Sequence, residues 1–307
     1  MGDVAGNLRK AEKLVHEAFR SGAEWVILPE FFTSAMAFHP KMLEAARPIH
    51  AEPLQLLVSL AAQHSGVVGG SFIAVRGENA YNTFALAFPD GSIFFHDKDQ
   101  PTMWENCYYI GGSDDGLLDT PAGPVGAALC WEMIRSRTAR RLLDKVNLVV
   151  GGSCWWDLPD DAPPHRAALG ARNLALLTET PTRLARMLGI PIIHASHCGL
   201  FEGRALLDFA LHEDRVYRSR YLGESQIVDG HGTVLARRTS EEGEGIILAE
   251  IMPGPVEGDR DPIPDRFWIP ELWGSLLRAW EKENALGQYY YQKLQPARHY
   301  FQSITEK

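Results

Sequence analysis

The sequence predicts an α/β fold with mixed sheets, because two patterns share the chain. In the first half, short apolar runs alternate with segments whose apolar residues recur at helical spacing, as in strands between helices. Elsewhere, several apolar runs follow one another closely and are separated by turn residues, so neighbouring strands can pair directly. The composition of the 307 residues, 45% hydrophobic and 22% charged, is that of an ordinary globular protein.

The chain opens on a helix. Asn7 can cap a helix that runs to about Arg20, with apolar residues on one face, and Gly22 ends it. The apolar run at residues 25–28 then predicts a short buried strand, which ends just before Glu30.

Apolar residues at helical spacing predict a helix over residues 40–64. Runs of β-branched and aromatic residues then predict three strands, at residues 67–75, 81–88 and 92–96. Pro89-Asp90-Gly91 supplies the turn between the last two strands. Residues 111–119 are rich in Gly and Asp and predict a loop.

Strands and helices alternate again in the middle of the chain. Short apolar runs predict strands at residues 125–129, 146–150 and 190–194. Helical spacing predicts helices at residues 135–143 and 167–188, the second one bent near Pro181. Residues 226–235 predict a hairpin around Asp229-Gly230-His231-Gly232, and residues 246–251 a last strand.

The chain changes character after about Met252, so we expect a domain over residues 1–252 and a C-terminal extension over residues 253–307. Four prolines lie between Pro253 and Pro264, and one or two helices follow. The extension is rich in aromatic residues: Phe267, Trp268, Trp273, Trp280 and Tyr289-Tyr290-Tyr291. These side chains need a surface to cover, either the domain or a partner subunit.

Charge and hydropathy exclude several classes of partner. The 30 Lys and Arg against 39 Asp and Glu leave a net charge of −9, which argues against nucleic acid. One basic cluster is expected to form a solvated helix face, with the members Arg135, Arg137, Arg140 and Arg141. The sequence holds no apolar run of about 18 residues and no secretory core near its start, so we expect neither a membrane partner nor a signal peptide.

The four cysteines, Cys107, Cys130, Cys154 and Cys198, are scattered and form no CxxC pair. They predict neither a zinc knuckle nor a disulfide framework, and they favour a reducing cytoplasm. His194 and His197 beside Cys198 lack a further ligand set, so we expect no metal site.

Cys130 is the first candidate for chemistry. It lies where the predicted strand 125–129 meets a helix, the position at which nucleophiles are commonly presented. A helix N-terminus and a nearby cation would lower its pKa. The alternative is a buried apolar cysteine.

Two charged residues also follow predicted strands. Glu30 precedes Phe31-Phe32, and apolar surroundings raise the pKa of a carboxyl and suit it to general base catalysis. Lys98 could stabilise an oxyanion. Alternatively, Glu30 is a salt-bridged or capping residue and Lys98 a surface lysine. Together with Cys130 they would supply a nucleophile, its base and an electrophilic stabiliser.

Three segments carry a family resemblance: LPEFF at residues 28–32, HDKDQPTMWE at 96–105 and GAALCWEM at 126–133. They resemble the Glu, Lys and Cys signatures of the carbon–nitrogen hydrolase, or nitrilase, superfamily. Their order and the Lys–Cys separation of 32 residues fit. The stretch GESQIVDGHGTVL at 223–235 is similar to the late hairpin of that family, so the resemblance covers roughly residues 3–251.

The resemblance implies a four-layer α-β-β-α sandwich that pairs across helical faces, and hence a homodimer or a higher homo-oligomer. The family's first strand normally precedes the segment that matches Gly2-Asp3. We therefore expect a fold that lacks this strand.

The resemblance also implies a role for each residue: Glu30 is the general base, Lys98 the oxyanion stabiliser and Cys130 the nucleophile. Glu105 matches a further glutamate that orients the substrate or the lysine; the alternative is a helix-surface residue beside Trp104. No metal or organic cofactor is implied.

Four further residues are expected at the site. The backbone N–H of Trp131 is the second oxyanion donor. Trp155 and Trp156 follow the strand after the Cys helix, where the family lines its substrate pocket; the alternative is plain core. His197 is a pocket candidate, with a structural histidine as the alternative.

We predict hydrolysis of a small amide through a Cys thioester, with release of ammonia and a carboxylic acid. Nitrile hydrolysis is the main alternative. Cys130-Trp131-Glu132 and the KxxPTxxE pattern from Lys98 favour the nitrilase branch of the family. Residues 133–136 argue against it, because they lack the usual Pro-Leu continuation of that branch. A catalytically silent oligomeric scaffold and a peroxide-sensing thiol protein stay open. Acidic residues near the site could favour cationic or neutral substrates, unless they face solvent: Asp114, Asp115 and Glu132.

Overall fold

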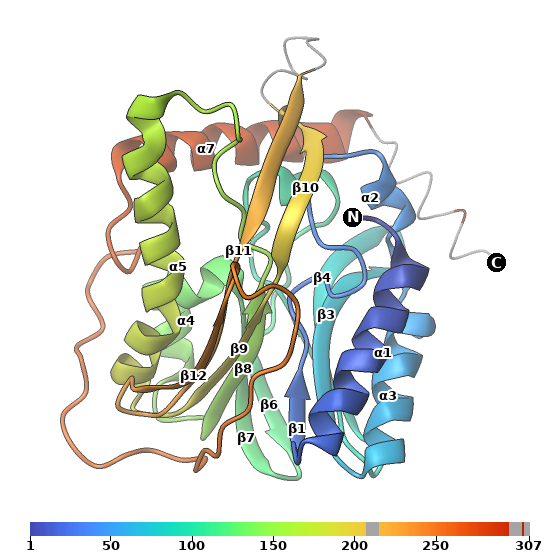
Figure 1. The fold of residues 1–307 in the computed structure, drawn as a ribbon, viewed down its shortest axis with the longest axis vertical. Coiled ribbons are helices and arrows are strands. Elements are labelled where there is room, and N and C mark those ends of the chain that lie inside the picture. Colours follow the sequence, from blue (N-terminus) through green and yellow to red (C-terminus); the bar gives the residue numbers. More distant parts are fainter. Residues whose placement is uncertain (207–214, 295–302, 304–307) are drawn as a thin grey trace.

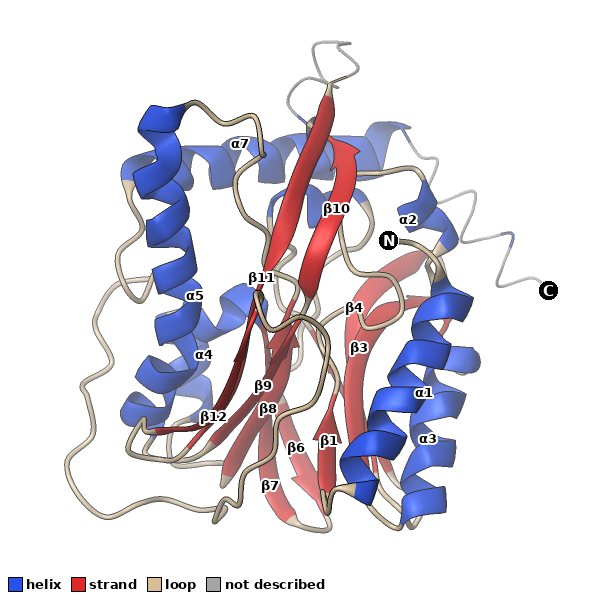
Figure 2. Cartoon of the chain, viewed as in Figure 1, coloured by secondary structure: helices blue, strands red, loops and turns tan. Residues whose placement is uncertain are grey.

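Four layers in the order α-β-β-α make up the chain, in the computed structural model that describes residues 1–206, 215–294 and 303 (Figure 1). Helices α1 (Val4–Arg20) and α3 (Glu52–His64) cover the outer face of one sheet. Helices α4 (Ser136–Leu142) and α5 (Ala167–Leu188) cover the other sheet (Figure 2). This architecture confirms the predicted fold class.

The first sheet has the strand order β1-β3-β4-β5, with β2 paired to β3. Its members are β1 (Trp25–Ile27), β2 (Arg47–Pro48), β3 (Val67–Arg76), β4 (Asn79–Ala87) and β5 (Ile93–Asp97). Strand β1 runs parallel to β3, and β3, β4 and β5 are successively antiparallel. Strands β1 and β5 therefore point the same way, so the residues that follow them lie at one edge of the sheet.

The second sheet has the order β10-β11-β9-β8-β7-β6, with β12 paired to β11. Its members are β6 (Leu117–Thr120), β7 (Gly123–Leu129), β8 (Leu148–Ser153), β9 (Ile192–Ser196), β10 (Cys198–Arg204), β11 (Val216–Val228) and β12 (Val234–Thr239). Strands β7, β8 and β9 are parallel. Their carboxyl ends present Cys130, Cys154 and His197 at one edge.

Apolar side chains fill the space between the two sheets and the space under each helical layer. Between the sheets, Phe84 and Leu86 of β4 pack with Leu129 of β7 and Val150 of β8, all fully buried. Because both faces of each sheet are covered, central strands such as β8 are buried along their whole length.

The first helices differ from the prediction in two ways. Helix α1 begins at Val4, since the Asp3 side chain accepts the N–H of Gly6 at 2.9 Å, whereas Asn7 donates to a loop carbonyl. The helix expected over 40–64 is two helices, α2 (Lys41–Glu44) and α3, on either side of β2. Proline disfavours helical conformation in the residue before it, so Pro48 interrupts the pattern.

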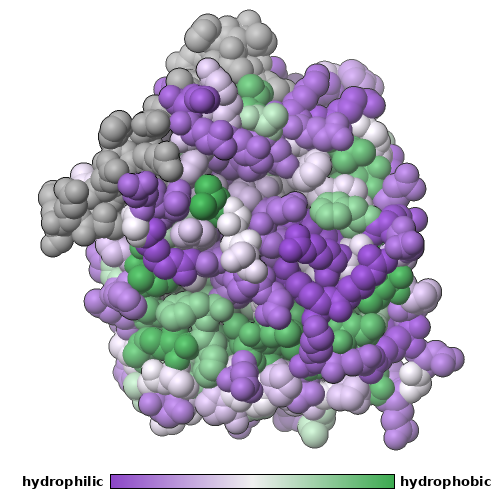
Figure 3. Space-filling model, turned by 180° about the vertical axis from the view of Figure 1, so that it is seen from behind, coloured by the Kyte–Doolittle hydropathy of each residue, from purple (hydrophilic) through white to green (hydrophobic). Residues whose placement is uncertain are grey.

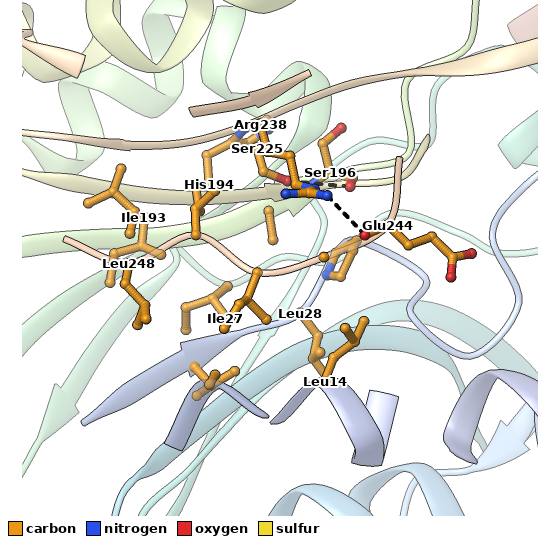
Figure 4. A pocket seen from close by; sticks show the side chains of 18 of the residues that line it. Leu14, Ile27, Leu28, Ile193, His194, Ser196, Ser225, Arg238, Glu244 and Leu248 are labelled. Atoms are coloured by element: carbon orange, nitrogen blue, oxygen red, sulfur yellow. Dashed lines mark hydrogen bonds between the residues drawn. The ribbon is translucent and has the colours of Figure 1, made fainter. Parts of the chain in front are cut away.

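One loop prediction and one strand prediction were also wrong. The expected loop 111–119 contains the start of β6, which pairs with β7. The strand expected at residues 246–251 does not form. A strand needs a partner ladder; this segment instead borders a cavity of about 1120 Å³, with Leu248 on one side and Ile27 and Leu28 on the other (Figure 4). In the described chain β1 is accordingly an edge strand, paired with β3.

The described residues beyond Met252 pack on the earlier part of the chain. Helix α7 (Gly274–Tyr289) lies across one end of the sandwich and continues into a π-helical turn, Tyr290–Leu294 (Figure 1). Asn284 of α7 accepts hydrogen bonds from the Met103 N–H at 2.7 Å and from Asn106 at 2.9 Å, both in the 3-10 turn η1 (Met103–Cys107). No helix of the described residues is long and apolar enough to cross a membrane.

The arginine cluster does not form one solvated face. Arg135 is fully buried and pairs with Asp99, and Arg141 is only 10% exposed and binds Asp99 and Glu132. Arg140, in contrast, pairs with Asp265 at the surface. Buried carboxylates explain the difference, because a guanidinium is tolerated inside a protein only where charged partners satisfy it.

Candidate active site

Three of the predicted residues form one hydrogen-bonded group at the sheet edge. Lys98, which directly follows β5, donates from Nζ to Glu30 Oε1 and to Glu105 Oε2, both at 2.8 Å. All three side chains are fully buried. An ammonium group can be buried between two carboxylates, because both accept a hydrogen bond from it.

Glu30 is held by groups from both sheets. Asn82 of β4 donates to Oε1 at 2.9 Å, and the Cys154 N–H after β8 donates to Oε2 at 2.9 Å. Burial raises the pKa of Glu30 to about 7, against the opposing effect of Lys98. A carboxyl with this pKa can accept and return a proton near neutral pH.

Glu105 and Lys98 hold each other in place. Glu105 Oε2 also accepts the Thr102 N–H at 2.9 Å and the Tyr109 hydroxyl, while Oε1 is buried and has no hydrogen-bond partner among the described residues. Burial lowers the pKa of Lys98, but the carboxylates of Glu105 and Glu30 outweigh it and raise that pKa above its ordinary value. Lys98 is therefore a permanent cation.

Cys130 begins a 3-10 turn, η2 (Cys130–Ile134), directly after β7. Its φ of 50° is left-handed, a strained conformation for a residue with a Cβ that is typical of functional sites. Burial, then Glu30, raise the thiol pKa well above its ordinary value, while Lys98 lowers it. This corrects the expected lowering: at 1% exposure desolvation dominates, so the thiol is protonated at rest and needs a base.

The aromatic residues lie around this turn. The backbone N–H of Trp131 is at the second position of η2, where a helical turn leaves N–H groups without an internal partner. The Trp131 ring lies 5.6 Å from that of Trp155, whose Nε1 donates to Asn173 at 2.9 Å. Trp156 stacks on Trp104 at 4.3 Å.

His197 supports the backbone of Glu30. Its Nε2 lies 2.7 Å from the Glu30 carbonyl oxygen, and burial lowers its pKa to about 4, so it is neutral and donates this bond. His197 also lines the cavity of Figure 4, which none of Glu30, Lys98 and Cys130 lines. That cavity is therefore separate from the group formed by Glu30, Lys98 and Cys130.

Within the described ranges, no group of three or more His, Cys, Asp or Glu side chains is arranged to hold a metal ion. His194 bonds Ser153 at 2.8 Å and the Glu224 carbonyl.

Sequence reasoning did not single out Asn82, the Cys154 N–H or Tyr109. Tyr109 lies four residues after Glu105, a spacing that could have indicated contact. Asn82 and Cys154 carry no such signal, because they reach Glu30 from other strands.

The sequence matches the family model described as carbon-nitrogen hydrolase over residues 1–261. It is 35% identical over 141 residues to omega-amidase NIT2-B of Xenopus laevis; this alignment covers 41% of the chain and 50% of that relative, so the chain spans about half its length. It is 26% identical over 273 residues to the aliphatic nitrilase of Rhodococcus rhodochrous, with 81% of the chain and 71% of the relative covered.

Solved structures show the same fold. A carbon-nitrogen hydrolase from Helicobacter pylori G27 superposes with a TM-score of 0.63 at 18% identity, covering 78% of this chain and 82% of that one.

The buried Lys98 yields a stability prediction. In Lys98→Met the cation that lowers the pKa of Glu30 is lost, so this pKa rises further above its value in the unfolded chain and the folded variant holds more protons. Its stability should therefore fall relative to wild type as pH rises, by about 1.4 kcal/mol per pH unit for each additional proton. Urea unfolding between pH 5 and 8 measures this slope.

Lys10→Met is the matched control, because Lys10 pairs with Glu244 at the surface. Its effect should stay within about 0.5 kcal/mol at every pH. Equal pH slopes for Lys98→Met and wild type would contradict the ion-paired arrangement.

Proposed function

The chain belongs to the carbon–nitrogen hydrolase family, and from this premise we propose that it hydrolyses a small amide through a thioester on Cys130. The observation that carries the proposal is the Lys98 ammonium, bonded to Glu30 and Glu105 at 2.8 Å and close enough to Cys130 to change the pKa of the thiol. A base, a cation and a thiol in one buried site are what acyl transfer to sulfur requires.

In the first half-reaction, Glu30 takes the Cys130 proton as Sγ attacks the amide carbon. The tetrahedral oxyanion lies between Lys98 Nζ and the Trp131 N–H, and each such donor contributes roughly 3–4 kcal/mol to the transition state. Protonated Glu30 then passes its proton to the leaving nitrogen. The carbon–nitrogen bond breaks, ammonia departs and a thioester remains.

In the second half-reaction, Glu30 takes a proton from water, and the hydroxide oxygen attacks the thioester carbon. The same two donors stabilise the second oxyanion. The carbon–sulfur bond then breaks, and Glu30 returns the proton to Sγ. Atoms and charges balance over the cycle, and the chain's own residues make every transfer.

Nitrile hydrolysis is the second candidate. The Cys-Trp-Glu sequence from Cys130 and the similarity to an aliphatic nitrilase favour it. Sulfur would add to the nitrile carbon, and water would then convert the thioimidate into the same thioester with loss of ammonia. Trp155 and Trp156 are the proposed pocket walls for either substrate.

Ammonia release from short and aromatic amides, N-carbamoyl compounds and the matching nitriles tests the proposal. We expect turnover of amides, abolished in Cys130→Ala. Release from nitriles only would favour the nitrilase alternative. No release from any compound, with Cys130 alkylated no faster than Cys107 or Cys154, would favour a catalytically silent scaffold.

The pKa of Glu30, about 7, predicts the pH dependence. Only ionised Glu30 accepts the thiol proton, so kcat/KM should rise with pH along an acidic limb with an apparent pKa near 7. In Glu30→Gln the limb should vanish and the rate fall at least about 100-fold. Rates measured from pH 5 to 9 that stay flat in the wild type would argue against Glu30 as the base.

We further propose a cytoplasmic homodimer or higher oligomer. The described cysteines are free, which suits a reducing compartment. Leu200, Met252 and Tyr289 are 88%, 86% and 58% exposed, and apolar groups form a band across the lower half of the face in Figure 3. Sedimentation should give at least twice the 34.2 kDa chain mass; a single 34.2 kDa species at micromolar concentration would contradict the assembly.

A further inference from the structure

Glu132 is a fully buried carboxylate, two residues beyond Cys130, that none of the proposed chemical steps uses. Its Oε2 accepts the Leu129 N–H at 2.8 Å and lies 2.9 Å from His96 Nε2. Its Oε1 accepts the Asp99 N–H at 3.0 Å and Arg141 Nη2 at 2.9 Å. A carboxylate has about four acceptor positions, so this one is saturated.

Three of the four donors come from the two segments that carry the proposed chemistry, and the fourth, Arg141, comes from α4. Leu129 immediately precedes Cys130, and Asp99 immediately follows Lys98. His96 lies two residues before Lys98, at the end of β5. One side chain therefore joins the backbone before Cys130 to the backbone after Lys98 and to the His96 side chain before Lys98.

We propose that Glu132 is a positioning residue that holds the Lys98 ammonium at the Cys130 thiol. This inference rests on the proposed function for its catalytic meaning. Glu132 also ties down the backbone around the left-handed Cys130, a conformation that persists only where the surroundings hold it.

The charges around Glu132 favour a positioning role over a direct electrostatic effect of Glu132 on the Cys130 thiol. Although burial opposes it, the carboxylates of Glu132 and Asp114 raise the pKa of His96 to about 10, so this imidazole is cationic. Three cations thus face three anions in the cluster: His96, Arg135 and Arg141 against Glu132, Asp99 and Asp114. The formal charges of the cluster cancel, and the largest influences on the thiol pKa come from burial, Glu30, Lys98 and Glu105, which are outside it.

The same contacts exclude a role in substrate selection. The sequence allowed Glu132 to favour cationic substrates, but its acceptor positions are filled by protein donors. A substrate cation would have to displace one of them.

Glu132→Gln tests the proposal, because its amide NH₂ must face one of the two donor pairs whichever way it is turned. Lys98 lowers the pKa of Cys130, so a displaced ammonium leaves less thiolate. We expect iodoacetamide to alkylate Cys130 at least tenfold more slowly at pH 7.5, with peptide mass spectrometry resolving each cysteine. In hydrolysis, kcat should fall at least 100-fold and KM change less than threefold.

The direction of the change in alkylation rate distinguishes displacement of the Lys98 ammonium from simple loss of the Glu132 charge. Removal of one negative charge alone would lower the thiol pKa and accelerate alkylation. Unchanged or faster alkylation in Glu132→Gln would therefore overturn the proposal, even if wild type hydrolyses no compound offered. If the wild type hydrolyses none of the compounds, the proposed function fails, and the alkylation rate alone tests the positioning role of Glu132.

Glu224→Gln is the matched control. Glu224 is also buried and paired with an arginine, Arg237, but away from Lys98 and Cys130. Its alkylation rate should stay within twofold of wild type. If Glu132→Gln does not unfold cooperatively, His96→Asn removes one of the four donors to Glu132, together with the bond to Asp114, and should slow alkylation at least threefold; an unchanged rate there would likewise overturn the proposal.

Discussion

The burial of one ammonium group, that of Lys98, between two carboxylates is the constraint on which this site depends. An unpaired charge in the interior is strongly unfavourable, so Lys98 requires Glu30 and Glu105 within hydrogen-bond distance. The parallel direction of β1 and β5 brings the first pair together, and the η1 turn supplies the second. Burial of Glu30 itself raises its pKa to about 7 against the opposing effect of Lys98, which suits the proposed role of base.

A second buried cluster, formed by Glu132 and its charged neighbours, is hydrogen-bonded to the segments that carry Lys98 and Cys130. Glu132 connects the segments of Lys98 and Cys130, while Arg135 and Arg141 neutralise its neighbour Asp99. A cluster whose members are all paired is rigid, because any displacement leaves a buried charge without its partner. The left-handed backbone at Cys130 is next to the Leu129 N–H, which Glu132 accepts.

The extension adds a covering layer. Helix α7 lies beyond residue 261, where the family match ends, yet it binds the turn that carries Glu105 through Asn284. The side chains of Glu30, Lys98 and Cys130 are at most 1% exposed. Cys130 lies in one buried cluster with Trp268 and Leu272 of this segment.

The sequence by itself determined the α/β class with mixed sheets and the positions of Glu30, Lys98 and Cys130 after strands, because periodicity and short motifs are local properties. Only the tertiary structure decided which side chains are buried together. It placed Arg135 inside, brought Asn82 and the Cys154 N–H to Glu30, and left residues 246–251 without a partner strand. It also reversed the expected shift of the Cys130 pKa, since desolvation depends on neighbours from distant segments that no local pattern records.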